Sequence, residues 1–295
     1  MKIAIYGHYF NSDTKPFVEE LLAALNQRNA EIYLEIGFEK LVKEHLNLEK
    51  SYPTFSSYSD LDDSFDLFFT VGGDGTMLRC ITFIRDSNIP VIGVNIGRLG
   101  FLATVKKEVI TEAVAALYKK DYQIRERSLL QVQTEPPQEN LASFNLALNE
   151  VTVSRKDTAS MITVDTYLDG EYLTSYWADG LITATPTGST GYSLSCGGPV
   201  ITPQAKSFVL TPIAPHNLNA RPLVIPEDTK IDMDITGRED DFSLSLDSRI
   251  ATIPKGTKIH IEKASFSIKM IHLNDQTFIK TLREKMLWGE DTRNQ

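Results

Sequence analysis

The stretch TVGGDGTML, Thr70 to Leu78, constrains the fold of this chain more than any other segment. It follows the apolar run Asp66 to Phe69 and precedes a pattern that is typical of a helix. Glycine permits a sharp turn and lets another molecule approach the backbone closely. A glycine loop between a strand and a helix is therefore typical of a phosphate site. The carboxylate of Asp74 is unexpected in such a loop, because it has the same sign of charge as a phosphate.

Strand and helix patterns alternate around this loop. Alternation of this kind favours a mostly parallel sheet with helices on its faces, and ligands then bind beyond the carboxyl ends of the strands. We therefore expect residues 1–116 to form an α/β domain that cradles a nucleotide. The strand patterns lie at 2–7, 31–36, 66–71 and 90–97, and the helix patterns at 14–30 and 75–88.

The pattern changes after about residue 116, where apolar and polar residues alternate in one strand after another. This alternation predicts antiparallel strands with one buried face. We expect residues 117–275 to form a β-sandwich-like domain, with Asp169-Gly170 as a hairpin turn. Residues 276–295 contain a helix pattern, and we expect this C-terminal helix to pack back on the first domain. The strand patterns lie at 128–135, 145–155, 161–177, 241–253, 255–263 and 266–273.

Composition limits the class of protein. The 295 residues include 42% hydrophobic and 23% charged side chains, as in ordinary soluble domains. The net charge of −9 argues against a general nucleic-acid binder, although one small anion needs only a local positive field. The chain has no apolar run long enough for a membrane span and no secretion-signal pattern at its N-terminus. Two lone cysteines suit a reducing compartment, so we expect a cytoplasmic protein without a membrane or nucleic-acid partner.

The loop around Asp74 has two interpretations. It could be a plain strand-to-helix turn in which Asp74 caps the helix. Alternatively, the backbone N–H groups of Gly72, Gly73 and Gly75 hold phosphate oxygens, and Asp74 acts as the base that deprotonates an attacking hydroxyl. The second interpretation requires a divalent ion such as Mg²⁺ to offset the negative charge. The sequence shows no metal-ligand motif, so we expect the ion to be held mainly by the phosphates of the ligand, with Asp74 as the candidate protein contact.

A second glycine-rich segment, DGLITATPTGSTGYSLSCGGPV, runs from Asp179 to Val200. Its hydroxyl side chains and exposed backbone suit ribose and phosphate contacts. The alternative is a serine- and threonine-rich loop of a β domain. The pair Asn149-Glu150 lies in the same half of the chain and adds polar groups that could bind sugar hydroxyls.

Taken together, these motifs resemble the NAD kinases. The matching pieces occur in the expected order over nearly the whole chain, and TPTGST-x-YSLS-x-GGP is far more specific than GGDGT, which lipid kinases and phosphofructokinase-like enzymes share. The matching segments are GGDGT (72–76), NIGRLGFL (95–102), NE (149–150), the segment 179–200, PHNLNARPLV (215–224), LDSR (246–249) and TLREKMLW (281–288).

The resemblance implies an activity and a set of site residues. NAD kinases transfer the γ-phosphoryl group of ATP to the 2′-hydroxyl of the adenosine ribose of NAD, which gives NADP. Asp74 matches the catalytic aspartate, Asn149 and Glu150 match the pair that binds the adenosine portion, and Arg79 becomes a candidate phosphate contact. Many members of the family are homodimers or homotetramers, and we expect the same here. The remaining candidate contacts with NAD or ATP are Phe101, Ser160, Trp177, Asp179, Thr187, Thr190, Gly191, Tyr192, Ser193, Leu194, Ser195, Ala214 and Arg249.

Three positions depart from the common family pattern. Gly191 and Cys196 stand where alanine is common, and Arg249 replaces a glutamine of some relatives, so a cation there would favour a phosphorylated ligand. We interpret the nearby Asp247 as a turn residue. Two other functions stay open from the sequence: a kinase of a lipid or sugar phosphate, and a protein that senses NAD without turnover.

Overall fold

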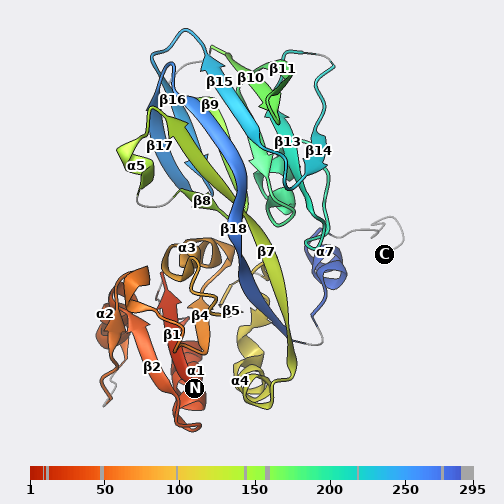
Figure 1. Cartoon of the computed structure of the whole chain (residues 1–295). Coiled ribbons are helices and arrows are strands. Elements are labelled where there is room, and N and C mark those ends of the chain that lie inside the picture. Colours follow the sequence, from red (N-terminus) through yellow and green to blue (C-terminus); the bar gives the residue numbers. More distant parts are fainter. Residues whose placement is uncertain are drawn as a thin grey trace. The chain divides into compact units, whose positions relative to one another are not determined.

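The computed structural model describes residues 1–8, 10, 13–46, 50–97, 99–142, 145–156, 160–217, 219–273 and 276–286. They divide into two compact units (Figure 1): unit 1 is Met1–Glu126 with Ile268–Gln295, and unit 2 is Arg127–Ser267. Four motif positions, Arg98, Leu218, Leu287 and Trp288, lie outside the described residues, as does the rest of the segment 287–295.

Unit 1 is built on a parallel sheet in the order β18-β5-β4-β1-β2-β3, with β6 beside β5. Strands β4 and β5 are buried along their whole length, because helices cover both faces. The strands are β1 (Lys2–Gly7), β2 (Glu31–Glu35), β3 (Thr54–Phe55), β4 (Leu67–Val71), β5 (Val91–Asn95), β6 (Val105–Lys106) and the last residues of β18 (Lys258–Leu273).

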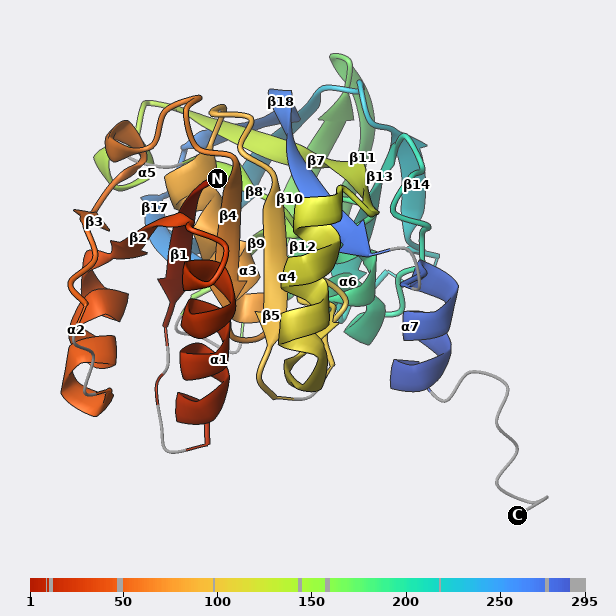
Figure 2. The same ribbon diagram turned by 90° about the horizontal axis from the view of Figure 1, so that it is seen from below.

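The helices of unit 1 pack on opposite faces of this sheet. Residues of α1, α2 and α4 share one apolar cluster with alternate strand residues such as Ile5 and Phe69, and Figure 2 shows α1 and α4 side by side over the strands. Helix α3 takes the other face, where Met77 contacts Thr70. The sequence analysis did not predict α2 or α4. The helical elements are α1 (Lys15–Asn26), α2 (Ile36–His45), η1 (Tyr58–Asp60), α3 (Asp74–Ile84), η2 (Lys107–Val109), α4 (Ile110–Lys119) and α7 (Phe278–Met286).

Unit 2 consists of two mostly antiparallel sheets. One has the strand order β14-β13-β12-β9-β16-β17, and the other contains β11-β10-β15-β18 with β7 and β8. The short helical elements α5 (Glu139–Ala142), η3 (Gly188–Thr190) and α6 (Tyr192–Ser195) lie between the strands. The strands are β7 (Tyr122–Glu135), β8 (Leu146–Ala147), β9 (Glu150–Arg155), β10 (Ile162–Leu168), β11 (Glu171–Ala178), β12 (Gly180–Ala184), β13 (Ser207–Ile213), β14 (Leu223–Pro226), β15 (Ile231–Thr236), β16 (Asp241–Leu246) and β17 (Arg249–Pro254).

The apolar faces of the two sheets form a single core in unit 2. Val164 and Ile231 of one sheet share a cluster with Val153 and Leu244 of the other. The predicted fold class, an α/β domain followed by an antiparallel β domain, is confirmed. The predicted break between 255–263 and 266–273 is wrong: β18 runs through as one strand, because no turn-forming glycine or proline interrupts the extended pattern there.

The predicted hairpin turn is present in the structure. Asp169 and Gly170 form the β10–β11 turn with φ values of 51° and 83°, as a tight hairpin requires. Helix α7 belongs to unit 1. In the part of the chain that the structure describes, no helix is both long and apolar enough to cross a bilayer.

Candidate functional site

The glycine loop of unit 1 lies at the carboxyl end of β4, at the start of α3. Gly72 has φ +154°, and a Cβ on it would overlap the hydroxyl of Thr76, so glycine is required by the protein itself. Gly73 is the N-cap of α3, and Asp74 is the first helical residue.

The Asp74 carboxylate does not cap its own helix. Its Oδ2 accepts the N–H of Phe101 (2.8 Å), and its Oδ1 accepts the N–H groups of Leu102 (3.0 Å) and Ala103 (3.0 Å). Gly100 precedes this segment, and a Cβ on it would overlap the same carboxylate. Asp74 therefore holds the chain segment after β5 against the start of α3, and the helix-cap interpretation is wrong.

Gly73 and Gly75 differ from Gly72 because the protein does not crowd them. Among the described residues, no atom lies within 4 Å of the position that a Cβ would take at either glycine. Their backbone is open at the first turn of α3, where N–H groups lack intrahelical partners and the helix dipole favours negative charge. The loop is therefore suited to hold an anion such as a phosphate.

Arg79 follows on α3, and its exposed guanidinium contacts a histidine. Its Nη1 lies 2.6 Å from Nε2 of His8, the residue after β1. Burial, together with the Arg79 charge, lowers the pKa of His8, so the imidazole is neutral next to the cation. Two nitrogen-bearing side chains thus lie at the carboxyl edge of neighbouring strands. Phe101 belongs to the same unit, and its ring packs 6.2 Å from the ring of Phe278.

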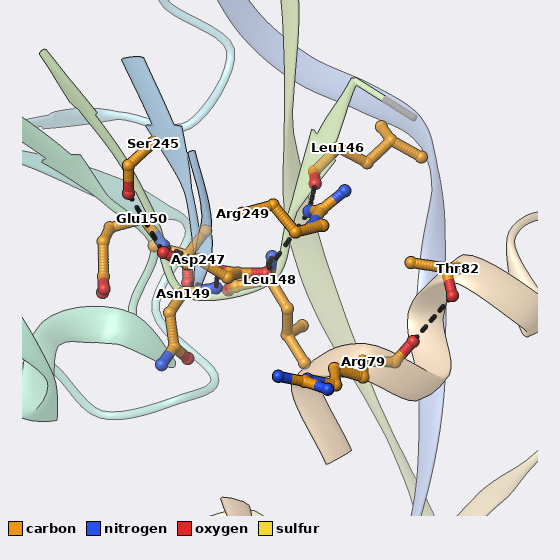
Figure 3. Close-up of polar contacts among 10 residues, drawn as sticks. Arg79, Thr82, Leu146, Leu148, Asn149, Glu150, Ser245, Asp247 and Arg249 are labelled. Atoms are coloured by element: carbon orange, nitrogen blue, oxygen red, sulfur yellow. Dashed lines mark hydrogen bonds and ion pairs between the residues drawn. The ribbon is translucent and has the colours of Figure 1, made fainter. Parts of the chain in front are cut away.

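In unit 2, the pair Asn149-Glu150 stands at the start of β9 and is held by Asp247 (Figure 3). Asp247 Oδ2 accepts the N–H of Leu148 (3.0 Å), and Oδ1 accepts those of Asn149 (2.8 Å) and Glu150 (3.2 Å). Arg249 Nη2 lies 3.8 Å from Asp247 Oδ2 and donates to the carbonyl of Leu146. Burial lowers the pKa of Arg249 to about 10, so the guanidinium keeps its charge at neutral pH.

Asn149 and Glu150 each carry a buried oxygen without a partner. Asn149 Oδ1 and Glu150 Oε2 find no hydrogen-bond partner among the described residues. Burial first, and the Asp247 carboxylate second, raise the pKa of Glu150 to about 8. Buried polar atoms of this kind are rarely left unpaired in proteins, so the pair is prepared for a ligand with hydrogen-bonding groups.

The segment 185–195 packs against the same pair. Thr185 Oγ1 donates to the carbonyl of Leu148 (2.6 Å) and accepts the N–H of Gly188 (3.1 Å). A Cβ on Gly188 would overlap the Asn149 carbonyl. At Gly191 a Cβ would lie 3.1 Å from Glu150 Oε2, so glycine leaves more room beside that oxygen than alanine would.

The other predicted residues of this segment fall into two groups. Ser193 is fully buried, and its hydroxyl pairs with that of Thr211 (2.8 Å), while Thr187 is nearly buried. The ring of Tyr192, in contrast, is 46% exposed and free to meet a ligand. Thr190 and Leu194 are half-buried, and Ser195 is exposed.

Asp179 forms a bidentate pair with Arg155. Arg155 Nε donates to Oδ1 (3.0 Å) and Nη2 to Oδ2 (3.2 Å), which fixes the carboxylate after β11. Trp177 is 43% exposed, and its ring lies 4.3 Å from that of His216. Ala214 has φ 44°, which is rare for a residue other than glycine and is typical of functional loops. Ser160 is half-buried beside the undescribed residues 157–159.

The sequence analysis missed three residues that hold this site together. Asp247 was interpreted only as a turn residue, and Arg155 and Thr185 were not selected. The local sequence signals for these three residues were weak, because each residue contacts atoms that are distant in sequence. For example, Leu148 and Asp247 are 99 residues apart. The position of Asp247 in a turn between two alternating strands was the one available sign.

No residues in the described ranges form a cluster of three or more histidine, cysteine, aspartate or glutamate side chains that could hold a metal ion.

Unit 1, with an open glycine loop at the carboxyl edge of a parallel sheet, defines an α/β protein of the nucleotide-phosphate-binding class. Comparison with known proteins narrows this class. Residues 9–122 match the ATP-NAD kinase N-terminal domain, and residues 148–273 match the ATP-NAD kinase C-terminal domain. The chain is 54% identical to the NAD kinase of Flavobacterium johnsoniae over 294 residues and 39% identical to that of Bacteroides fragilis over 293, with 99–100% of each chain covered. The chain belongs to the NAD kinase family.

Solved structures agree with this assignment. An NAD kinase from Archaeoglobus fulgidus in complex with ATP superposes with a TM-score of 0.73 at 26% identity, covering 97% of both chains. Yeast NADH kinase complexed with NADH superposes with a TM-score of 0.86 over 100% of this chain and 90% of its own, and at 22% identity it shows the shared fold.

Proposed function

We propose that this protein transfers the γ-phosphoryl group of ATP to the 2′-hydroxyl of the adenosine ribose of NAD, giving NADP and ADP, with Asp74 as general base. One observation carries the assignment: a carboxylate is fixed at the first residue of α3, beside the open backbone of Gly73 and Gly75. Family membership supports it, since relatives of up to 54% identity are NAD kinases.

The hydrogen bonds of Asp74 leave room for this role. A carboxylate offers about four lone-pair directions. Oδ1 accepts two N–H groups and Oδ2 accepts one, so one direction on Oδ2 remains for a substrate hydroxyl. The 2′-oxygen forms a bond to the γ-phosphorus, the bond from that phosphorus to the bridging oxygen of ADP breaks, and the hydroxyl proton passes to Oδ2. The transition state of such transfers is loose, so positioning contributes more than basicity.

Unit 1 supplies the contacts for the phosphates in this proposal. The N–H groups of Gly73 and Gly75 at the start of α3 would hold phosphate oxygens, and the exposed Arg79 adds a cation. Mg²⁺ would be coordinated by the phosphate oxygens, because the described part of the chain builds no cluster of ligands for it. The ion would supply charge neutralisation at the phosphates.

Unit 2 supplies the groups that recognise the nucleoside. Asn149 Oδ1 and Glu150 Oε2 are unpaired polar atoms that can form hydrogen bonds with the ribose. The exposed ring of Tyr192 offers an apolar face for a base. Asp179, held by Arg155, is a fixed acceptor for a further hydroxyl.

The experiment incubates the full-length protein with NAD, ATP and Mg²⁺ and measures NADP. Asp74→Asn should reduce kcat by about a thousandfold, as expected for loss of a general base. Asp86→Asn is the matched control, because Asp86 is an exposed aspartate just after α3 and should leave kcat unchanged. Wild-type turnover in Asp74→Asn would overturn the role of Asp74, and no NADP from the wild type would overturn the proposed function.

We also propose a cytoplasmic, homo-oligomeric protein. Cys80 and Cys196 are both free, which suits a reducing compartment. Ile250 is 77% exposed on the edge strand β17, where an apolar side chain favours contact with another chain. Light scattering after size-exclusion chromatography tests the oligomeric state.

A further inference from the structure

Asp247 has no part in the phosphoryl transfer proposed above, yet its side chain is only 2% exposed. It occupies the turn of the β16–β17 hairpin with φ 53°, and its own N–H donates to the carbonyl of Glu150 (2.9 Å). The carboxylate in turn accepts three N–H groups from residues 148–150. The β16–β17 turn and the start of β9 are therefore joined by hydrogen bonds donated from both sides.

These bonds have a consequence for the side chains of the pair. With the backbone of 148–150 fixed, Asn149 and Glu150 are each left with one buried oxygen that the described protein does not satisfy. The Asp247 carboxylate already accepts three backbone N–H groups. It therefore orders the neighbouring residues Asn149 and Glu150 rather than the ligand.

The second consequence is electrostatic. Burial raises the pKa of Asp247, while its three N–H donors and the Arg249 cation 3.8 Å away act against this rise and favour the anion. Glu150 Oε2 has no hydrogen-bond partner among the described residues, and the Asp247 charge adds to the rise in the pKa of Glu150. Two carboxylates coupled in this way do not both ionise easily, so the proton resides on the less stabilised one.

The other groups near Glu150 do not change this conclusion. The segment 188–195, which approaches Glu150 Oε2 at Gly191, contains no aspartate, glutamate, lysine, arginine or histidine. Its one titratable side chain is Tyr192, and burial raises the pKa of that phenol. Among the described residues, Asp247 is the charged group that acts on the pKa of Glu150, and Arg249 pairs with Asp247.

We propose that Asp247 is a positioning residue for the nucleoside subsite: it holds the backbone of 148–150 and keeps a proton on Glu150, which then donates a hydrogen bond to a ribose oxygen. This inference rests on the proposed function, because the ligand is the ribose of a nucleotide. In this way the β16–β17 turn presents the side chains of Asn149 and Glu150 to the ligand in the correct protonation state.

The test measures kcat and KM for NAD between pH 6 and 9.5 in the wild type, Asp247→Asn, Glu150→Gln and Asp169→Asn. Asp169 is the matched control, since it lies in a hairpin turn with φ 51° and accepts one backbone N–H, that of Lys230 (3.0 Å), in a different turn. In the wild type, KM should rise with pH through a midpoint near 8, and Glu150→Gln should remove that dependence.

Asp247→Asn should raise KM at pH 7 by about tenfold, as expected when buried donors lose a charged acceptor. It should move the midpoint at least one pH unit lower and change kcat by less than about threefold. Asp169→Asn should behave as the wild type. A wild-type KM and midpoint in Asp247→Asn would overturn the proposal, as would a tenfold loss confined to kcat.

A second measurement covers the case in which Asp247→Asn does not fold. The wild-type protein is labelled with ¹³C at the glutamate carboxyls, and the Glu150 resonance is assigned by its absence in Glu150→Gln. A titration midpoint near 8 supports the proposal, and a midpoint near the ordinary value of about 4.3 overturns it. This titration needs no turnover, so its outcome is separate from that of the NADP assay.

Discussion

The Asp74 carboxylate occupies the space that a Cβ would need at Gly100, so only glycine fits at that position. The carboxylate reaches that position to accept the N–H groups of residues 101–103. The glycine 26 positions after the aspartate is therefore part of the Asp74 site, although it carries no side chain.

The first prediction follows directly from this pair. Gly100→Ala should displace the Asp74 carboxylate from its three donors and lower kcat for NADP formation by at least about a hundredfold. Gly97→Ala is the control in the same loop, because its Cβ would meet only Asn95 Oδ1 at 3.9 Å. Steady-state kinetics and a thermal melt of both variants check this. Equal kcat values in the two variants would contradict it.

The second prediction separates the glycines of the loop by what crowds them. Gly75→Ala should fold with wild-type stability, because no described atom lies within 4 Å of the new Cβ, and alanine is a better helix former. It should raise KM for ATP by about tenfold, since the methyl group covers the backbone proposed to hold phosphate.

Gly72→Ala should do the opposite. Its φ of +154° and the overlap with Thr76 destabilise the fold by about 1–3 kcal/mol. Urea unfolding and ATP titration of the two variants measure both effects. An unchanged KM in Gly75→Ala would remove Gly75 from the proposed phosphate site.

The third prediction concerns the pH dependence of stability. Burial and Asp247 raise the pKa of Glu150 from 4.5 to about 8, so in this window the folded state keeps a proton that the unfolded chain releases. The free energy of unfolding contributed by Glu150 is therefore fully present below pH 4.5 and is lost as the pH rises through about 8.

Glu150→Gln should flatten this fall in stability between pH 5 and 8.5. Some slope should remain, because burial also raises the pKa of Asp247. Denaturant unfolding at several pH values measures it, with Glu171→Gln, an exposed glutamate of β11, as the charge-matched control. Parallel stability curves for the wild type and Glu150→Gln would contradict the prediction.

The fourth prediction compares a buried and an exposed serine of the segment 190–195. Ser193→Ala should cost about 1–3 kcal/mol of unfolding free energy, because it removes a buried hydroxyl that pairs with Thr211. Ser195→Ala should change stability by less than about 0.5 kcal/mol, since Ser195 is exposed, and any effect should be on KM for NAD. Denaturant unfolding and NAD kinetics of the two variants distinguish the roles. Equal stability of the two would show that the buried pair is dispensable.

Much of the fold was predictable from sequence because its signals are local. The alternation of apolar runs and helix patterns indicated the α/β unit, and two-residue alternation with Asp169-Gly170 indicated the antiparallel strands. Helix α2 was missed because it begins at Ile36, directly after β2 ends at Glu35, and its second residue, Gly37, is a weak helix former. The continuous strand β18 was divided in two because only its pairing with other strands shows that it does not turn.

The sequence by itself predicted roles for Asp74, Asn149 and Glu150, because glycine loops and the family motifs place these side chain types at recognisable spacings. Only the tertiary structure showed which backbone each carboxylate holds. Asp74 binds donors 27–29 residues away, and Asp247 binds donors 97–99 residues away. Contacts at that separation depend on strand order and register, which local preferences do not encode. The raised pKa of Glu150 likewise depends on burial and on Asp247, so it arises only once the β16–β17 hairpin has folded against β9.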